Sequence, residues 1–288
     1  GLCCDSRVLK KGDVFFALHG VKDDGVQYVA EAVKRGASAI VCQSRLETIS
    51  VPMIVVNDAR EALARASVEF YQCPTRDFYL CGITGTNGKT TLTYLLEKLW
   101  SPARTGVLGT VNFRYADQVL PATHTTPDSL ALQAMFAQMK KSRVSHVAME
   151  VSSHALEQKR VFGCDFDSAV FTNLTQDHLD YHHDMESYYQ SKKILFAQSL
   201  VQSCKKNLLA VINADDVYGQ RLCQELKGSP LSLKRFSEKD PSADLRVTRS
   251  EFTIRGSECD VLYQGKTYFL STNLIGAHGL RNIMAALL

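Results

Sequence analysis

The residues best suited to carry chemistry lie in one short loop, Gly85-Thr86-Asn87-Gly88-Lys89-Thr90-Thr91. An apolar stretch (78–84) precedes this loop and an amphipathic run (89–100) follows it. Glycine lets backbone amides approach a phosphate, and a helix N-terminus adds a favourable dipole. The pattern predicts a phosphate-binding loop in which Lys89 contacts the terminal phosphates and Thr90 reaches Mg²⁺. Ile83 stands where the usual pattern has its first glycine, so the loop is a variant.

A second candidate is Glu150, which closes the apolar stretch 144–150 and is followed by Val151-Ser152-Ser153-His154. A carboxylate at the end of an apolar strand must face a cation or a strong donor, because its burial is otherwise costly. Beside a phosphate loop the obvious cation is Mg²⁺. Without that loop, an acidic residue before Ser-Ser is more typical of a helix cap.

The third candidate follows the apolar stretch 168–172, where three histidines and three aspartates fall within residues 177–184. Spacing alone leaves two interpretations open, a metal or acid–base site and a solvated polar turn. His178 and His182 are one helical turn apart, but zinc would require a further Cys or His ligand. We expect His178 to be a magnesium ligand, with Asp180 and His182 in supporting or capping roles.

Three further groups carry weaker signals. Thr125 and Thr126 precede a predicted helix, where hydroxyls can contact an anion or simply cap the helix. Lys192 and Lys193 lie within a predicted helix, and paired lysines there usually mark a solvated face. His278 and Asn282 are four residues apart and share one face of the last predicted helix.

The elements that position these residues indicate an α/β fold. From residue 78 onward, apolar strands alternate with helices, which is typical of a mostly parallel sheet covered on both faces. Ligands of such sheets gather beyond the C-terminal ends of the strands, and each candidate follows such an end. The expected strands are 78–84, 105–110, 144–150, 168–172 and 208–212, and the expected helices are 89–100, 128–141, 153–161, 184–200 and 216–227.

The two ends of the chain differ from this central pattern. Residues 1–73 read as a small α/β unit, and the polar Pro74-Thr75-Arg76 predicts a boundary, giving domains 1–75 and 76–288. Segments 244–255, 258–263 and 267–271 are short and alternating, which predicts a small antiparallel appendage. A final helix starts near Leu280 and reaches Leu288 without a stop signal, so we expect the protein to continue.

Composition narrows the class of protein. The 288 residues are 45% hydrophobic and 22% charged, and the basic residues behind the net charge of +3 are scattered among acids, which argues against a nucleic-acid partner. No apolar run approaches the roughly 18 residues needed to span a bilayer, so we expect no membrane partner. Nine cysteines without metal-ligand spacing indicate reduced thiols in the cytoplasm.

Taken together, these motifs resemble the Mur ligase family, and more closely its MurE branch of UDP-N-acetylmuramoyl-L-alanyl-D-glutamate:amino-acid ligases. The stretches that carry the resemblance are Asp5-Ser6-Arg7, Asp23-Asp24-Gly25, the phosphate loop, Thr125-Thr126-Pro127, Glu150–Leu156, Asp177–His182 and the terminal Gly-x-His-x-x-x-Asn. The resemblance implies a small N-terminal UDP-binding domain and a central P-loop NTPase-like domain. It also implies a C-terminal amino-acid-binding domain that this chain does not contain.

The resemblance further implies ATP-dependent amide formation in peptidoglycan synthesis, by a cytoplasmic and monomeric enzyme. Lys89, Lys192 and His178 would be catalytic. ATP would be held by the loop residues Gly85 to Thr91 with His278 and Asn282, and Mg²⁺, at two sites, by Thr90, Glu150, His178 and a carbamylated Lys192. The UDP-N-acetylmuramoyl dipeptide would contact Ser6, Thr125, Thr126, Ser152, Gln158 and Arg160. The sequence leaves open whether diaminopimelate or lysine is added.

Two other functions stay open at this stage. A folylpolyglutamate synthetase-like ligase would share the ATP chemistry, although the Glu150–Arg160 and Asp177–His182 stretches argue against it. A nucleotide-binding protein without ligase activity is the alternative outside ligases.

Overall fold

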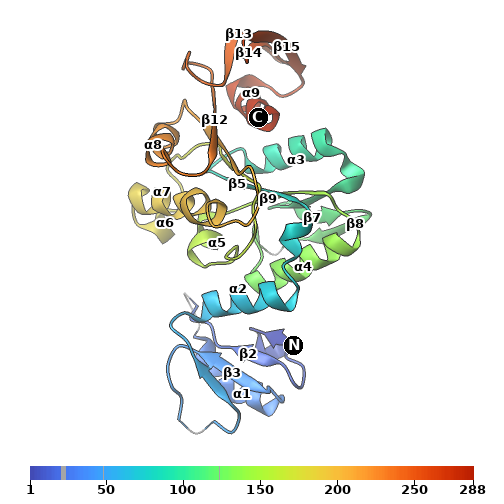
Figure 1. Cartoon of the computed structure of the whole chain (residues 1–288), viewed down its shortest axis with the longest axis vertical. Coiled ribbons are helices and arrows are strands. Elements are labelled where there is room, and N and C mark those ends of the chain that lie inside the picture. The colour runs from blue at the N-terminus through green and yellow to red at the C-terminus, as the bar shows by residue number, and fades with distance from the viewer. Residues whose placement is uncertain (21–23, 48, 123) are drawn as a thin grey trace.

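The computed structural model describes residues 1–20, 24–47, 49–122 and 124–288, and its strands form two separate sheets (Figure 1). The smaller sheet pairs its four strands in parallel, in the order β1 (Leu2–Cys3), β2 (Val14–Phe16), β3 (Ala39–Cys42) and β4 (Met53–Val55). Asp23, part of one motif of the family resemblance, lies outside the described residues.

Two helices cover the small sheet. Helix α1 (Val29–Lys34) follows a 3₁₀ turn at Gly25–Tyr28 and packs on the side of Phe15 and Ile40. Helix α2 (Ala59–Phe70) begins after Asp58, which caps it by accepting hydrogen bonds from the amides of Arg60 and Glu61. Helix α2 also packs against α4 (Ser129–Lys141) of the larger unit, so it lies between the two sheets (Figure 1).

The larger sheet has eleven strands and contains the predicted parallel core. In the described residues, seven neighbouring strands, β13-β12-β11-β10-β5-β9-β6, run in parallel, and each end of the sheet is finished by antiparallel pairs. The strands are β5 (Tyr79–Thr84), β6 (Thr105–Leu108), β7 (Asn112–Tyr115), β8 (Gln118–Pro121), β9 (His146–Glu150), β10 (Ser168–Phe171), β11 (Leu209–Asn213), β12 (Ser232–Ser237), β13 (Leu245–Thr253), β14 (Gly256–Tyr263) and β15 (Lys266–Thr272). The α/β fold class with a mostly parallel sheet is therefore confirmed.

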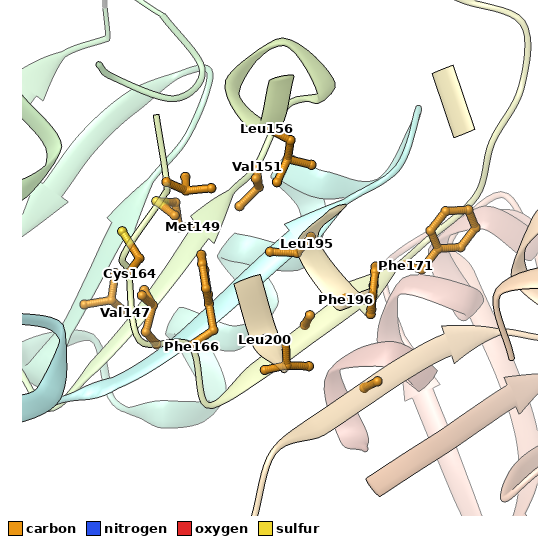
Figure 2. Packing of buried hydrophobic residues seen from close by; sticks show 14 of the residues in the cluster. Val147, Met149, Val151, Leu156, Cys164, Phe166, Phe171, Leu195, Phe196 and Leu200 are labelled. Atoms are coloured by element: carbon orange, nitrogen blue, oxygen red, sulfur yellow. The ribbon is translucent and has the colours of Figure 1, made fainter. Parts of the chain in front are cut away.

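Helices cover both faces of the parallel core. Helices α3 (Lys89–Trp100) and α9 (Gly276–Leu287) bury Leu92, Leu96, Leu280 and Met284 against one face. The other face packs against α4, α5 (Ser153–Glu157), α7 (Met185–Ile194), the π-helical turn η5 (Leu195–Leu200) and α8 (Val217–Glu225). Figure 2 shows part of this second layer, in which Leu195, Phe196 and Leu200 meet side chains of β9 and β10.

Some elements differ from the sequence expectation. Strand β12 was not expected, because Lys234 and Arg235 interrupt its apolar pattern; in the fold they are half-buried and pair with Asp244 and Asp240. Because β12 pairs in parallel with β13, the antiparallel segment is continuous with the main sheet. The hairpin β7–β8 and the short helix α6 (Leu179–His182) were also missed.

Helix boundaries shifted for local reasons. Helix α9 starts at Gly276 rather than near Leu280, since its N-cap residue, Ile275, offers no side-chain cap and the sequence carries no start signal there. Helix α5 ends at Glu157, because Lys159 adopts a left-handed conformation (φ 55°) that ends a helix. Within the described ranges, no helix is both long and apolar enough to cross a membrane.

Candidate functional site

The predicted loop joins the central strand β5 to helix α3. Gly85 (φ 142°) and Gly88 (φ 91°) adopt backbone conformations that favour glycine, and a Cβ at Gly85 would overlap Thr172 Oγ1. Gly88 is the N-cap of α3, where no side chain caps the first turn. Amides of an uncapped first turn can bind an anion, so the geometry suits a phosphate.

The end of β10 holds this loop in shape. The amides of Thr86 and Asn87 donate to Asn173, to its backbone oxygen and its Oδ1 respectively, at 2.9 Å each. The Thr172 hydroxyl donates to the Asn87 carbonyl oxygen at 2.7 Å. The sequence argument placed the site at this sheet edge but did not single out Thr172 and Asn173, because Thr and Asn after a strand are also ordinary turn residues.

Two lysines converge on the loop. Lys89 Nζ donates to the carbonyl oxygens of Gly85 and Thr86 at 2.8 Å each, and Lys192 Nζ donates to the Gly85 oxygen at 3.1 Å. Burial lowers the pKa of both ammonium groups, and for Lys192 the nearby charge of Lys89 lowers it further. The solvated position expected for paired lysines in a helix describes Lys193, which is partly exposed and pairs with Glu225. Lys192, in contrast, is fully buried.

Tyr188 connects Lys192 to the loop. The Lys192 ammonium lies 4.4 Å from the centroid of the Tyr188 ring, whose hydroxyl is 3.4 Å from Thr86 Oγ1. The His182 ring also stacks on this ring, at 4.9 Å between centroids. Sequence reasoning missed Tyr188, since an aromatic residue in an amphipathic helix is usually a core residue.

Glu150 ends β9, the other neighbour of β5, and is only 1% exposed. Its carboxylate accepts hydrogen bonds from Thr90 Oγ1 at 2.9 Å and from the amide and hydroxyl of Thr110 at 3.1 and 3.0 Å. Hydroxyl and carboxylate oxygens are the ligands that Mg²⁺ prefers, so the side chains of Thr90 and Glu150 fit a magnesium ion. Thr110 is the last residue of the predicted strand 105–110 and was not singled out.

The structure does not join His178 to Thr90 and Glu150. The His178 side chain is half-exposed and lies near Asp177 and the rings of His154 and Tyr188. In the part of the chain that the structure describes, no three His, Cys, Asp or Glu side chains form a metal-binding group.

His182 is buried beside these rings. Its Nε2 lies 2.8 Å from Ser153 Oγ and its Nδ1 3.3 Å from Glu157 Oε1. Ser191 also donates to Glu157. His182 therefore ties α6 to α5 and α7, which agrees with the supporting role expected for it.

Four residues expected to bind the sugar dipeptide form one hydrogen-bonded network. Thr126 Oγ1 donates to the Glu150 carbonyl oxygen at 2.8 Å and accepts from the Ser152 amide at 3.2 Å. Arg160 donates to the Thr126 oxygen and to Gln158 Oε1, both at 2.7 Å. The network thus starts directly beside the buried carboxylate.

The remaining candidates lie in three places. Thr125 contacts Thr110 through their hydroxyl groups at 3.0 Å. Ser6 begins the 3₁₀ turn that follows β1 of the small sheet, where it lines a separate pocket of about 310 Å³ with Asp5, Arg7 and Tyr28. Asn282 reaches the loop, because a Cβ on Gly88 would overlap its Oδ1, whereas His278 is exposed.

Two family models match the chain. The Mur ligase middle domain matches residues 83–288, and the model described as Mur ligase family, catalytic domain, matches residues 1–71. A UDP-N-acetylmuramoyl-L-alanyl-D-glutamate–2,6-diaminopimelate ligase of Geobacter metallireducens is 44% identical over 291 residues, which cover 99% of this chain and 56% of that protein.

Solved structures agree with these matches. The structure of a ligase with that same name superposes with a TM-score of 0.85 at 28% identity, covering 100% of this chain and 58% of the other. Folylpolyglutamate synthase of Mycobacterium tuberculosis, complexed with ADP and AMPPCP, reaches 0.61 at 18% identity, with 79% of this chain and 57% of that chain covered, and shares the fold. The chain spans a little more than half the length of these relatives.

Proposed function

Because the chain belongs to the Mur ligase family, we propose that it is the nucleotide-binding part of an ATP-dependent ligase that extends UDP-N-acetylmuramoyl-L-alanyl-D-glutamate by one amino acid. The relatives are named for 2,6-diaminopimelate, which we propose as the amino acid added. One observation carries the proposal: an uncapped glycine loop with Lys89 lies between the buried Glu150 of β9 and the end of β10.

The loop residues Gly85 to Thr91 hold the phosphates of ATP in this proposal. Lys89 already donates two hydrogen bonds within the loop, and an incoming phosphate would exchange these carbonyl partners for anionic oxygens. Asn282, and His278 from the same helix, would line the adenine site. This arrangement supports ATP as the cofactor.

Magnesium at this site supplies charge neutralisation for the phosphates. Thr90 and Glu150 would hold one ion, on the evidence of their oxygen-rich contacts. The family resemblance adds His178, and Lys192 after carbamylation, which gives two proposed metal positions. Lys192 is suited to that modification, because its lowered pKa favours the neutral amine that reacts with CO₂.

The residues proposed to bind the UDP-N-acetylmuramoyl dipeptide lie partly at the same edge of the large sheet. The network of Thr126, Ser152, Gln158 and Arg160, with Thr125 beside it, would hold the muramoyl dipeptide. The pocket at Ser6 would take the uridine end, which assigns residues 1–75 to the UDP group and residues 76–288 to ATP.

The reaction proceeds in two steps. The D-glutamate side-chain carboxylate attacks the γ-phosphorus of ATP, the bond to the β-phosphate oxygen breaks, and an acyl phosphate and ADP form. The amine of the incoming amino acid then attacks the acyl carbon, loses a proton and expels phosphate. Two anions must meet in the first step, so Lys89 contributes by neutralising charge and the loop amides by fixing geometry.

Lys89→Ala tests the proposal in the complete protein. We expect phosphate release to fall by at least about 100-fold, because a preorganised charge contact in the transition state is lost. Lys193→Ala is the control, since its ammonium pairs with Glu225 and not with the loop. Wild-type phosphate release by Lys89→Ala would exclude this role.

Two wider properties are part of the proposal. The nine cysteines are free thiols, which supports the cytoplasm as the compartment.

We also propose that the protein is a monomer, which light scattering of the purified protein would test.

A further inference from the structure

Helix α9 carries Asn282 to the phosphate loop, and the residue before it, Arg281, enters an acidic site on neighbouring strands. We propose that Arg281 is a positioning residue: its ion pairs with Glu238 and Asp215 hold α9 so that the Asn282 amide recognises the adenine base beside Gly88. This inference rests on the proposed function, because it assumes that the loop binds an adenine nucleotide.

The first step is the position of Asn282. It is 9% exposed, and its Oδ1 occupies the space that a Cβ on Gly88 would need. An asparagine amide offers one acceptor and a donor group, which match the N6 donor and N7 acceptor of adenine and not the acceptors of guanine. The amide can select the base only if α9 keeps it at this distance from the loop.

The second step is what fixes α9. Leu280, Met284 and Ala285 bury its apolar face in the cluster that contains Leu92 and Leu96 of α3. Apolar burial is non-directional, so it leaves the helix free to slide or rotate by small amounts. The Gly276 amide donates to Ser257 Oγ at 3.2 Å, which anchors only the first residue of the helix. A second directional contact, closer to Asn282, is therefore needed to set the register and rotation of α9.

Arg281 provides this directional contact. Successive residues point about 100° apart around a helix, so Arg281 faces a different neighbour from Asn282. Its Nε lies 2.5 Å from Glu238 Oε1 and 3.9 Å from Asp215 Oδ2. Both Arg281 Nε and Glu238 Oε1 are buried, and their geometry is that of an ion pair rather than a hydrogen bond.

The acidic site is rigid on the side of the sheet. Asp215 follows β11 and accepts hydrogen bonds from Ser237 Oγ at 2.5 Å and from the amides of Glu238 and Lys239 at 2.7 and 3.2 Å. The Asp215 and Glu238 side chains are only 6% and 16% exposed. Without the guanidinium, two poorly solvated carboxylates would face α9 and repel each other. The cation is thus required for the observed position of the helix.

The test compares the binding of MgADP and MgGDP to the 288-residue chain by calorimetry. We expect Arg281→Met to weaken ADP binding about tenfold, the value of one base-specific contact, and to leave GDP binding unchanged. Arg281→Lys, which keeps the charge, should retain most of the ADP affinity. Arg235→Met is the matched control, because Arg235 lies on β12 and pairs with Asp240, which follows that strand, rather than with α9. It should bind both nucleotides as the wild type does.

A double-mutant cycle with Asn282→Ala tests whether Arg281 acts through Asn282. We expect Arg281→Met to add little to the loss already caused by Asn282→Ala. Equal and additive losses, or an unchanged ADP affinity in Arg281→Met, would overturn the inference. If Arg281→Met does not fold, Arg281→Gln, which also removes the charge, replaces it in the cycle, and the same additivity decides. A wild-type chain that binds no ADP would instead overturn the proposed function.

Discussion

Replacing Lys192 by methionine should stabilise the fold while it removes a proposed functional group. Lys192 is 1% exposed, and burial, followed by the charge of Lys89, lowers its pKa well below the ordinary value. Its ammonium donates to the Gly85 oxygen at 3.1 Å and lies over the Tyr188 ring. Methionine keeps an unbranched side chain of similar length without the buried charge.

The expected gain follows from the opposing contributions. Replacing a buried charge by an apolar side chain of similar volume stabilises proteins by up to about 4 kcal/mol. The lost hydrogen bond and cation–π contact offset about 1 kcal/mol each. The Gly85 oxygen is not orphaned, because Lys89 still donates to it at 2.8 Å. We therefore expect a net gain of about 1–2 kcal/mol, or about 2–6 °C in Tm.

The gain should depend on pH with a definite sign. A lysine whose pKa is depressed by folding binds its proton more readily in the unfolded chain, so wild-type stability rises with pH between the folded and the unfolded pKa. The advantage of Lys192→Met is thus greatest below the folded pKa and disappears above the unfolded value of about 10.4.

Urea denaturation in CO₂-free buffer at several pH values measures the difference in free energy of unfolding between Lys192→Met and the wild type. The neighbouring Lys193→Met is the matched control, because its 2.8 Å pair with Glu225 is partly exposed and its loss should cost at most about 1 kcal/mol. Lys192→Met that is less stable than Lys193→Met at neutral pH, or a difference from wild type that does not shrink as pH rises, would refute the reasoning.

Three further variants test the site and its support. Gly88→Ala should lose about 1–3 kcal/mol of stability and most ADP affinity, because the new Cβ overlaps Asn282 Oδ1 and the backbone φ of 91° strains an alanine. Gly228→Ala is the control, since this residue has a similar φ of 82° but open space around it. Equal losses in both variants would contradict the contact between the loop and Asn282. Phe166→Ala should cost about 3–5 kcal/mol in urea denaturation, since this ring is fully buried beneath the sheet, and a loss below about 1 kcal/mol would show that its packing is dispensable. Glu150→Gln should abolish the increase in ADP affinity that Mg²⁺ gives while sparing Mg²⁺-free binding, and calorimetry with an unchanged Mg²⁺ effect would exclude Glu150 as a ligand.

Much of the fold could be predicted because local and global signals agree in the centre of the chain. Strands β5, β9, β10 and β11 are nearly continuous apolar runs. Each ends on a polar residue or is followed by one at the same sheet edge, namely Thr84, Glu150, Thr172 and Asn213. The elements that were missed lie at the margins. β8 is fully exposed, and β12 is half polar, so neither carries the periodicity of a buried strand.

The site shows a similar limit. The proximity of Glu150 to the loop could be predicted, because both follow from strands of one parallel sheet, whose carboxyl ends meet at the same edge. The burial of Lys192 could not be found, since it depends on α7 packing against a loop more than one hundred residues earlier in the chain. The contacts of Thr110, Thr172 and Asn173 with the loop and with Glu150 depend in the same way on strand order, which composition does not encode.

One assay tests the central proposal most directly. The complete protein is supplied with MgATP, UDP-N-acetylmuramoyl-L-alanyl-D-glutamate and either diaminopimelate or lysine, and ADP and the extended peptide are measured together. We predict one ADP for each amide formed with diaminopimelate, and neither product in Lys89→Ala. Extended peptide formed without ADP, or formed equally by Lys89→Ala, would contradict the proposal that this loop drives amide synthesis.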